Sequence, residues 1–440
     1  MTLKNLALIA AMVAFAPASY GQKPQSAMDR INLDRARQML RDAHDELKKH
    51  YYDTKYHGLD LEARYKEYDA SIARAASLAQ AYGIVATFLD GFNDSHTFFR
   101  PPQRPARIDY GFRIQMFGQK ALIARVRPGT DAESKLKPGD EVLVWNKFNV
   151  QRDVLWKMNY FFNTVAPQSA SNLTVRNPAG EVREVQAQPS VHQLKRRLDI
   201  AGPNGDVDLW QLVREEEIFD HNVRQRTVES DGVMIWKVPE FDMTDEEVDR
   251  IFTNARKHPA LILDLRDNPG GLVVTLERMV GNVFDHDVKI ADRIGRKELK
   301  PQLAKTRGGS IFNGKLIVLV DSASASAAEL FARVIQLEKR GIVIGDTSSG
   351  SVMEARGYSE SQGTDTRIFY SFSITDADLI MKDGKSLEHN GVVPDELVVP
   401  TPQDVAEGRD PALARAAEIA GVKLDPVKAG KMFPLEWLPL

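Results

Sequence analysis

Apolar positions follow two different patterns along this chain. In residues 22–92 they recur at about helical spacing among charged side chains, as in the run from Ile31 through Leu40 to Leu47. In residues 231–400, short and uninterrupted apolar runs alternate with helical patterns instead. Because strands that alternate with helices pair in parallel through right-handed crossovers, this second part predicts an α/β fold with a parallel or mixed sheet.

The α/β part predicts four strands, which are the apolar runs at 232–238, 260–265, 315–320 and 341–345. Helical patterns begin near Met243, Val273 and Ser326, and the first carries acidic residues in its opening turn, as helix starts often do. Beyond residue 345 the alternation weakens, so the pattern there predicts an irregular segment.

A β-rich unit separates these two parts. Strand-like runs are divided by glycine turns, and they lie at 110–114, 121–126, 136–145 and 173–176, with an amphipathic stretch at 156–162. A polar, charge-rich connection with a strand or two follows. The predicted domains are a helical region at 22–100, the β-rich domain at 101–190, the connection at 191–230, and the α/β core with a helical tail at 231–440.

The amino-acid composition excludes several classes of function for this protein. The chain has 440 residues, of which 43% are hydrophobic and 27% charged, as in an ordinary soluble globular protein. A net charge of −3 gives no electrostatic footprint for nucleic acid. The absence of cysteine excludes disulfides, thiol catalysis and thiolate metal sites. No metal site stands out in the sequence, and we expect no cofactor.

The N-terminus has the pattern of a secretory signal peptide at residues 1–21. Lys4 supplies a positive charge, 6–16 form an apolar stretch, and 17–21 are small residues. We expect cleavage after Gly21, with Ala18 as an alternative. The apolar stretch is too short to span a bilayer, so the sequence predicts an exported protein, periplasmic or secreted, without stable membrane insertion.

The first candidate for a catalytic residue is Ser326. It lies where the predicted strand at 315–320 turns through small residues into a predicted helix. A helix start directs free N–H groups and a positive dipole end toward such a corner, and a serine there can act as a nucleophile. A second interpretation is structural, because Ser326 and Glu329 fit a capping box. On this pattern alone, capping is favoured.

A second candidate is His96. Most of the 9 histidines, such as His50 and His258, have polar neighbours and are expected to be solvated. His96 differs because hydroxyl residues flank it and two phenylalanines follow, which would exclude water. Taken by itself, it is still more typical of a structural histidine.

Four separated segments together resemble one family. In order they are Asp94-Ser95-His96, the Asp-Leu-Arg-Asp-Asn-Pro-Gly-Gly string at 264–271, the Ser-Ala-Ser-Ala-Ser-Ala-Ala-Glu string at 322–329, and the Glu-His-Asn-Gly-Val-Val-Pro-Asp string at 388–395. This order resembles the C-terminal processing serine peptidases, which include the tail-specific proteases and the tricorn core. The resemblance covers residues 85–410. It implies a crotonase-like (ClpP/crotonase) α/β core, an inserted PDZ domain and an N-terminal helical region.

The resemblance also implies roles for single residues. The nucleophile of this family lies three residues before the glutamate, which selects Ser326. Tail-specific members activate it with a downstream lysine, but Ser351 falls at that place here, and no lysine lies between 339 and 382. Tricorn-like members use a histidine instead, which maps to His96, with Ser95 orienting it and Glu388 completing the set.

Elementary chemistry supports these assignments. A histidine with a pKa near ~6.5 can accept and return the serine proton at neutral pH. Gly270 and Gly271 lack side chains that would block a carbonyl, so their N–H groups can join that of Ala327 in an oxyanion hole. His389 is a rival base, ranked lower because the tricorn-like pattern does not place the base there.

Two further expectations concern the surroundings. Asp264 and Asp267 are predicted to be structural, holding the glycine loop by hydrogen bonds. The β-rich domain resembles a protease-associated PDZ domain, which implies that the loop Tyr110-Gly111-Phe112 offers N–H groups to a peptide C-terminus. The alternative is a β-domain that only spaces its neighbours.

The leading hypothesis is an exported serine endopeptidase that acts on polypeptides, bound through their C-termini, and not on nucleic acid. An inactive peptide- or lipid-binding protein on the same scaffold is the alternative. A third, weaker interpretation is hydrolysis of a small ester.

Overall fold

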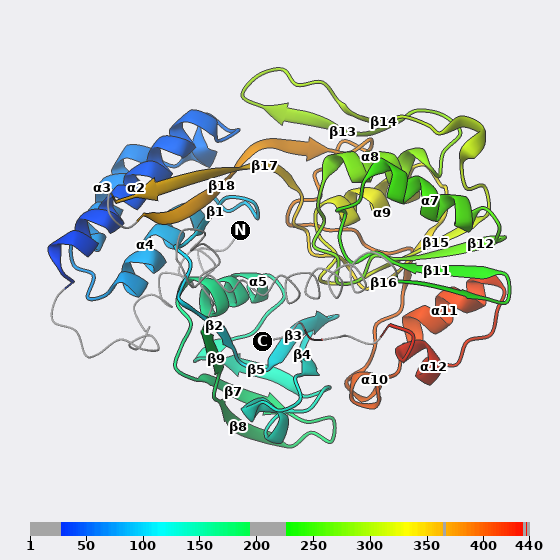
Figure 1. Ribbon diagram of the computed structural model, residues 1–440, viewed down its shortest axis with the longest axis horizontal. Helices are drawn as coiled ribbons and strands as arrows, with labels where there is room; N and C mark the ends of the chain where they lie inside the picture. The colour runs from blue at the N-terminus through cyan, green and yellow to red at the C-terminus, as the bar shows by residue number, and fades with distance from the viewer. Residues whose placement is uncertain (1–27, 194–225, 364–366, 434–436, 438–440) are drawn as a thin grey trace, which may run out of the picture.

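A computed structural model describes residues 28–193, 226–363, 367–433 and 437 (Figure 1). The predicted signal peptide and most of the predicted connection at 191–230 lie outside the described residues. Among the described helices, none has both the length and the apolar character needed to cross a bilayer.

The N-terminal region is helical, which confirms its apolar spacing. Its helices are α2 (Arg30–His50), α3 (Leu61–Ile72) and α4 (Leu78–Asp90), with a short 3₁₀ turn, η1 (Tyr56–Gly58). The side chains of Asp29, Asp60 and Ser77 cap them. Arg64 of α3 donates to the carbonyl groups of Thr87 and Phe88, which joins α3 to α4.

The β-rich unit is an antiparallel sheet in the order β3-β4-β5-β7-β8. Its strands are β3 (Phe112–Phe117), β4 (Lys120–Val126), β5 (Glu141–Trp145), β7 (Ser171–Arg176) and β8 (Val182–Ala187), and β6 (Phe148–Asn149) pairs with β5. The amphipathic stretch forms α5 (Leu155–Asn159) and a π-helical turn, η3 (Tyr160–Val165). A short 3₁₀ turn, η2 (Asp131–Ser134), follows β4, and β2 (Ala106–Asp109) pairs with β9 (Ser190–Gln193) where the chain enters and leaves the unit.

The core is a six-stranded sheet in the order β10-β11-β12-β15-β16-β19. Its strands are β10 (Thr227–Ser230), β11 (Val233–Lys237), β12 (Ala260–Asp264), β15 (Lys315–Val320), β16 (Ile342–Gly345) and β19 (Glu396–Leu397). All neighbours are parallel except β10 and β11, so the four predicted strands and their parallel pairing are confirmed.

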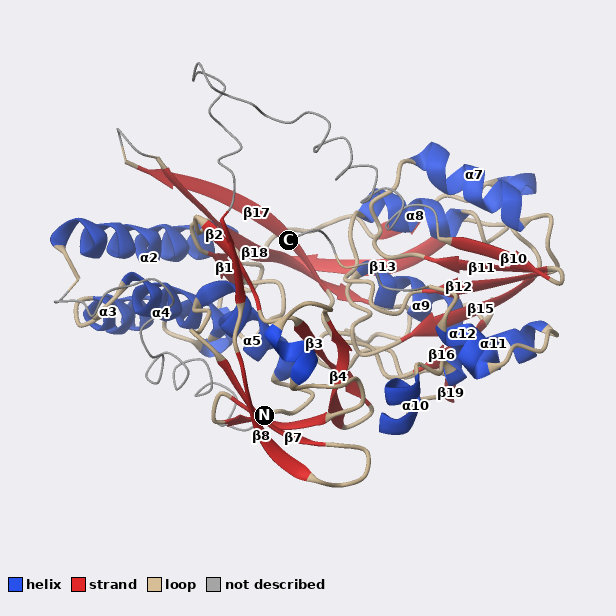
Figure 2. Cartoon of the chain, turned by 60° about the horizontal axis from the view of Figure 1, so that its bottom comes forward, coloured by secondary structure: helices blue, strands red, loops and turns tan. Residues whose placement is uncertain are grey.

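Helices cover both faces of this sheet (Figures 1 and 2). One face packs against α7 (Asp245–Ala255), α8 (Val273–Gly281) and α9 (Ala327–Leu337), and the other packs against α11 (Pro411–Ala420) and α12 (Pro426–Gly430), which follow α10 (Pro402–Glu407). Strand β12 packs against helices on both faces. Leu261 and Leu263 belong to the apolar cluster that contains α7, α8 and α9, and Ile262 belongs to the cluster that contains α11 and α12.

The segment after residue 345 is not irregular, so that prediction is wrong. It forms two long strands, β17 (Met353–Gln362) and β18 (Ile368–Ile380), in a second sheet with β1 (Phe98–Arg100), β13 (Val288–Gly295) and β14 (Gln302–Ala304). A further 3₁₀ turn is η4 (Gly308–Ser310). The sequence of β17 is mostly polar and half-exposed, so it lacks the apolar run that marks a buried strand.

This second sheet matters because it brings the N-terminal region to the core. Strand β1 begins two residues after His96 and pairs antiparallel with β18, and Phe99 lies opposite Phe372. Beside the strand, the Thr97 hydroxyl donates to the hydroxyl of Thr375, 3.1 Å away.

The β-rich unit is bonded to the core through β3. Gln115 donates to the Asp321 carboxylate over 2.6 Å, and Ser322 donates to the carbonyl of Met116 over 2.6 Å. Arg113 forms a bidentate ion pair with Asp267. The β-rich unit is therefore bonded to the two loops that carry the candidate glycines and the candidate serine.

The two-sided burial of β12 generates a stability prediction. Replacing Ile262, which has no exposed surface, by alanine leaves a cavity and lowers the free energy of unfolding by about 2–5 kcal/mol. The matched change Val182→Ala, at a strand residue that is 56% exposed, alters it by less than about 0.5 kcal/mol. Urea unfolding followed by tryptophan fluorescence measures both, and equal losses would contradict the assigned packing.

Candidate active site

Ser326 lies at the corner between β15 and α9, in a strained conformation. Its φ and ψ are 54° and −118°, a region that side-chain-bearing residues avoid at a cost of about 1–3 kcal/mol. The N–H of Glu329 donates to the carbonyl of Ser326 over 3.0 Å, and the N–H of Ser326 donates to the Glu329 carboxylate, so the predicted capping pair of Ser326 and Glu329 is present at the start of the helix. The turn therefore presents this hydroxyl at the N-terminus of α9, where the helix dipole is positive.

Glu329 fixes the loop beside Ser326. Its carboxylate is fully buried and accepts the N–H of Ser326 over 3.1 Å. It also accepts the Ser348 hydroxyl and the N–H groups of Gly350 and Ser351, the last two over 2.8 and 2.9 Å. Burial raises the pKa of Glu329 to about 7, although these donors favour the ionised form. One carboxylate thus holds both the serine corner and the following loop.

The glycine loop packs directly against the serine. A Cβ atom on Gly270 would lie 2.6 Å from the Cβ of Ser326, and φ of Gly270 is +101°, so only glycine fits. The N–H of Gly270 donates to the side-chain oxygen of Asn268 over 2.8 Å. Asn268 in turn accepts the N–H of Ala325 at its backbone oxygen over 2.9 Å.

Two other N–H groups remain available at this corner. Those of Gly271 and Ala327 make no hydrogen bond within the described parts of the chain. Of the three predicted oxyanion donors, Gly270 is therefore occupied by Asn268. Asn268 was not singled out by sequence reasoning, although an asparagine that binds backbone two residues on is a known turn signal.

His96 belongs to a hydrogen-bonded relay. Its Nδ1 atom is 2.8 Å from the hydroxyl of Ser95, and that hydroxyl donates to Glu388 Oε2 over 2.9 Å. The N–H of Ser95 also donates to Glu388 Oε1, over 2.7 Å. Because the Ser95 hydroxyl proton is given to the carboxylate, its oxygen accepts from Nδ1–H. The other ring nitrogen, Nε2, is then unprotonated and can accept a proton.

Two consecutive residues join the relay to the serine corner. The N–H of Val352 donates to Glu388 Oε2 over 2.8 Å, and the carbonyl of Ser351 accepts the N–H of Ser326 over 2.9 Å. The structure thus brings the predicted set of Ser326, Ser95 and Glu388 into one bonded network, with His96 attached to it through Ser95.

Burial sets the protonation of the relay. It lowers the pKa of His96, against the attraction of Asp94, so the imidazole is neutral at neutral pH. It raises the pKa of Glu388, against the opposing effects of His389 and of the donors from Val352 and Ser95.

His389, the rival base, is placed differently. Its Nε2 atom is 2.8 Å from the carbonyl of Asn93, and its side chain is 51% exposed. Its backbone N–H donates to the carbonyl of Gly350. The ring therefore contacts the outer side of the relay, where it lies 3.8 Å from Glu388 Oε1.

The two aspartates of the glycine loop have structural partners. Asp264 is buried and bonds Lys237 and Arg266, and Arg266 also pairs with Asp410. Although burial opposes it, Arg266 and Lys237 hold the pKa of Asp264 far below its usual range. Asp264 accepts the N–H of Arg266 in the loop, as predicted, whereas the Asp267 carboxylate binds Arg113 and so joins the loop to the β-rich unit.

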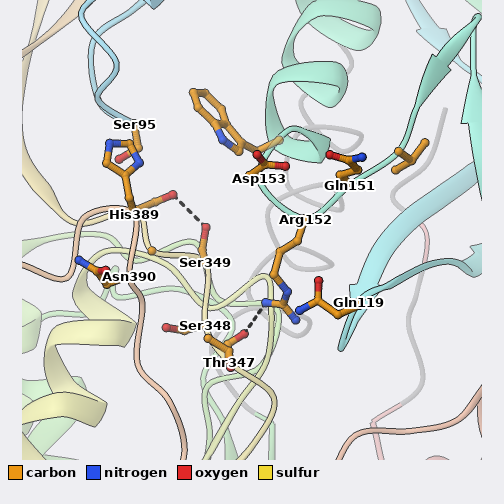
Figure 3. A pocket seen from close by; sticks show the side chains of 14 residues that line it. Ser95, Gln119, Gln151, Arg152, Asp153, Thr347, Ser348, Ser349, His389 and Asn390 are labelled. Carbon is orange, nitrogen blue, oxygen red and sulfur yellow. Dashed lines mark hydrogen bonds between the residues drawn. The ribbon is translucent and has the colours of Figure 1, made fainter. Parts of the chain in front are cut away.

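A cavity of about 530 Å³ opens between the β-rich unit and this site (Figure 3). Ser95, Ser351 and His389 line one side, and Arg152 and Trp156 line the other. Arg152 donates to the Thr347 carbonyl over 2.9 Å, which closes the base of the cavity. Within the described residues, no group of three or more His, Asp and Glu side chains could hold a metal ion.

A second cavity, of about 150 Å³, lies in the β-rich unit between β3 and the α5–η3 segment. Tyr110 and Phe112 of the predicted peptide-binding loop line it. The N–H of Gly111 donates to the Asp109 carboxylate over 2.8 Å, and the Tyr110 hydroxyl donates to the carbonyl of Gln168. The loop is thus held rigidly at one end of this cavity, and the Gly111 N–H, which the resemblance implied is offered to a peptide C-terminus, is already paired with Asp109.

Comparison with known proteins finds similarity to peptidases over parts of the chain. The model of peptidase family S41 matches residues 233–398, and the tricorn protease C1 domain matches residues 34–79. A tail-specific protease of Haemophilus influenzae is 24% identical over 319 residues, which are 66% of this chain and 42% of that protein. The chain therefore matches less than half the length of this relative.

Solved structures share the fold. Mature CPAF has a TM-score of 0.62 at 16% identity, covering 86% of this chain and 94% of CPAF. The photosystem II D1 C-terminal processing protease has a TM-score of 0.51 at 17% identity, covering 88% of this chain and 97% of that one. The mixed α/β fold of this chain is thus shared with these two solved structures.

The raised pKa of Glu329 predicts a pH dependence of stability. A buried carboxyl that titrates near 7 when folded, but near its ordinary value when unfolded, binds more protons in the folded state between these values. The free energy of unfolding should therefore fall, by on the order of 1–3 kcal/mol, as pH rises through this window.

Urea unfolding of the wild type and Glu329→Gln at several pH values tests this. The variant should show a smaller fall than the wild type, because Glu388 still contributes, whereas the control Glu338→Gln, at the other end of α9, should keep the wild-type fall. Identical pH profiles for wild type and Glu329→Gln would contradict the assignment.

Proposed function

Since the chain belongs to the C-terminal processing serine peptidases, we propose that it is an endopeptidase with Ser326 as nucleophile and His96 as general base. The observation that supports this most is the relay from His96 through Ser95 to Glu388, bonded to the serine corner through Ser351 and Val352. The relay supplies a base, a residue that orients this base and a carboxylate that stabilises its charged form, and a serine nucleophile needs these groups.

The proposed reaction follows from the donor and acceptor directions. Nε2 of His96 removes the Ser326 proton as the hydroxyl oxygen attacks the substrate carbonyl carbon. Ser95 holds the Nδ1–H, and Glu388 stabilises the imidazolium that forms. His96 then gives the proton to the departing amine, and water, activated in the same way, hydrolyses the acyl-enzyme.

The developing oxyanion lies between the N–H groups of Gly271 and Ala327 in this proposal. Ala327 directly follows Ser326 as the first residue of α9, and Gly271 directly follows Gly270, which packs against Ser326. A donor of this kind is typically worth about 10²–10³ in rate. Gly270 contributes through its missing side chain and not through its N–H.

A mechanism in which a lysine acts as the base does not fit this chain. Ser351 falls at the place of that lysine, and its hydroxyl lies 2.9 Å from that of Ser349. A neutral hydroxyl with a high pKa cannot serve as the base, so the imidazole takes this task. The intact relay also argues against an inactive peptide or lipid carrier.

We further propose that the core is crotonase-like, that the β-rich unit is a PDZ domain and that its groove binds substrate C-termini. The groove between an edge strand, β3, and the α5–η3 segment has the form used when a peptide adds a strand to a sheet. Export through the signal peptide at residues 1–21 would place the enzyme in the periplasm or outside the cell.

Substitution tests the mechanism on an unstructured, casein-like polypeptide. Ser326→Ala and His96→Ala should each lower kcat/KM by about 10³-fold or more, and Ser95→Ala by a smaller factor, because it only positions the ring. The control His286→Ala, an exposed histidine paired with Asp285, should leave kcat/KM unchanged. Turnover of all variants at the wild-type rate would remove the proposal.

The lowered pKa of His96 predicts a shifted pH profile. A base works only when deprotonated, so activity is lost as pH falls through its pKa. Because burial lowers this pKa, the acid limb of kcat/KM should lie below the ordinary histidine value of about 6.5. An acid limb above that value, measured by initial rates across buffers of constant ionic strength, would contradict His96 as the base.

A further inference from the structure

Asp94 shapes the turn that carries His96. Its Oδ1 atom accepts the backbone N–H groups of His96 and Thr97 over 3.0 and 2.7 Å, which is how an aspartate closes a tight turn. The same atom accepts the hydroxyl of Thr375 in β18 over 2.7 Å, and Thr375 in turn accepts the hydroxyl of Thr97. One oxygen of Asp94 therefore fixes the backbone of the histidine against the second sheet.

The other oxygen of this carboxylate is not used in the turn. Oδ2 of Asp94 is buried and has no hydrogen-bond donor within the described parts of the chain. The residue is only 5% exposed, so water screens its charge weakly. Burial, and next the charge of Asp94, raise the pKa of the neighbouring Tyr51, so this phenol is neutral. The charge of Asp94 therefore acts on its surroundings at nearly full strength.

A neutral residue could build the same turn. Asparagine also has a side-chain oxygen that accepts N–H groups in turns of this kind, and it avoids the free-energy cost of burying a charge. A buried negative charge is compensated when a positive group forms beside it. The imidazole of His96 becomes such a group when it takes the proton of Ser326 in the proposed reaction.

The other charged groups near the ring have different contacts. Glu388 reaches the ring through a serine hydroxyl, and His389 lies beyond it, 3.8 Å from Oε1 of Glu388. On the side of α4, Asp90 is paired with Lys157 of α5, 2.6 Å away. Burial lowers the pKa of the imidazole, and the attraction of Asp94 opposes this effect. Asp94 is therefore the carboxylate that acts on the ring directly through space.

We propose that Asp94 is a positioning residue for His96. Its Oδ1 atom holds the backbone that carries the ring, and its charge stabilises the imidazolium that forms while Ser326 attacks the substrate. Two carboxylates thus support one base, Glu388 through the hydroxyl of Ser95 and Asp94 through space. This inference rests on the proposed function, because it takes His96 to be the base.

The conservative variant Asp94→Asn separates the charge from the shape. Its amide oxygen can keep the turn, but the negative charge is lost. The kcat of casein hydrolysis should fall by about tenfold or more with KM nearly unchanged, because the imidazolium forms only after the substrate has bound. The acid limb of kcat/KM should move to lower pH, because the attraction that raises the pKa of His96 is gone.

A purely structural role of Asp94 predicts the opposite direction. If the variant only loosened the turn, water would reach the ring and its pKa would return toward the ordinary value of about 6.5. The acid limb would then move to higher pH. Such an upward shift would contradict the proposal even if kcat fell as expected.

A second measurement needs no catalysis. In chains that carry Ser326→Ala, the ring protons of His96 are followed by NMR across a range of pH, and the variant His96→Gln identifies their signal. The pKa of His96 should be lower with Asp94→Asn than without it. If the wild type hydrolyses no polypeptide while this difference is present, the proposed function is wrong, and the electrostatic contact between Asp94 and His96 is supported.

Two further variants control for folding. Asp60→Asn changes an exposed aspartate that caps α3 by accepting the N–H of Ala63, so kcat and the acid limb should stay at the wild-type values. Asp94→Ser keeps a neutral, turn-forming side chain and takes the place of Asp94→Asn if circular dichroism shows that the latter does not fold. An unchanged kcat, or an unchanged or raised pKa of His96, in a folded chain with either neutral residue would overturn the proposal.

Discussion

The arrangement depends on the buried carboxylate of Glu388. A buried carboxylate must be surrounded by donors, and here these come from two distant parts of the chain: Ser95 before the β-rich unit and Val352 in the core. Satisfying this one group therefore joins the N-terminal region to the core and orients His96 through Ser95. Removing any donor would leave this largely buried carboxylate without one of its hydrogen bonds.

The carboxylate of Glu329 is likewise surrounded by hydrogen-bond donors, on the other side of Ser326. It gathers N–H groups from the corner and from the following loop, so the backbone of Ser351 is held against that of Ser326. The small residues of that loop also leave room for the cavity above it, which Ser349 and Ser351 line.

The β-rich unit is not a free module beside this site. Arg113 and Gln115 of β3 bind Asp267 and Asp321, which belong to the loops that carry the glycines and the serine. Phe112 and Ile114 of the same strand line the second cavity. Residues of this one strand therefore line the second cavity and also bind the loops at the serine.

Local sequence patterns determined the helical region, the parallel core strands and the corner at Ser326, because apolar spacing and small turn residues act within a few positions of themselves. Tertiary structure alone decided the rest. The half-polar strand β17 forms only because β18 pairs with it. The Gly270 N–H donates to the Asn268 side chain because of the geometry of the loop. Likewise, the contacts that bring Ser95 to Glu388 and Trp437 to Arg127 join residues hundreds of positions apart, and no local pattern encodes such contacts.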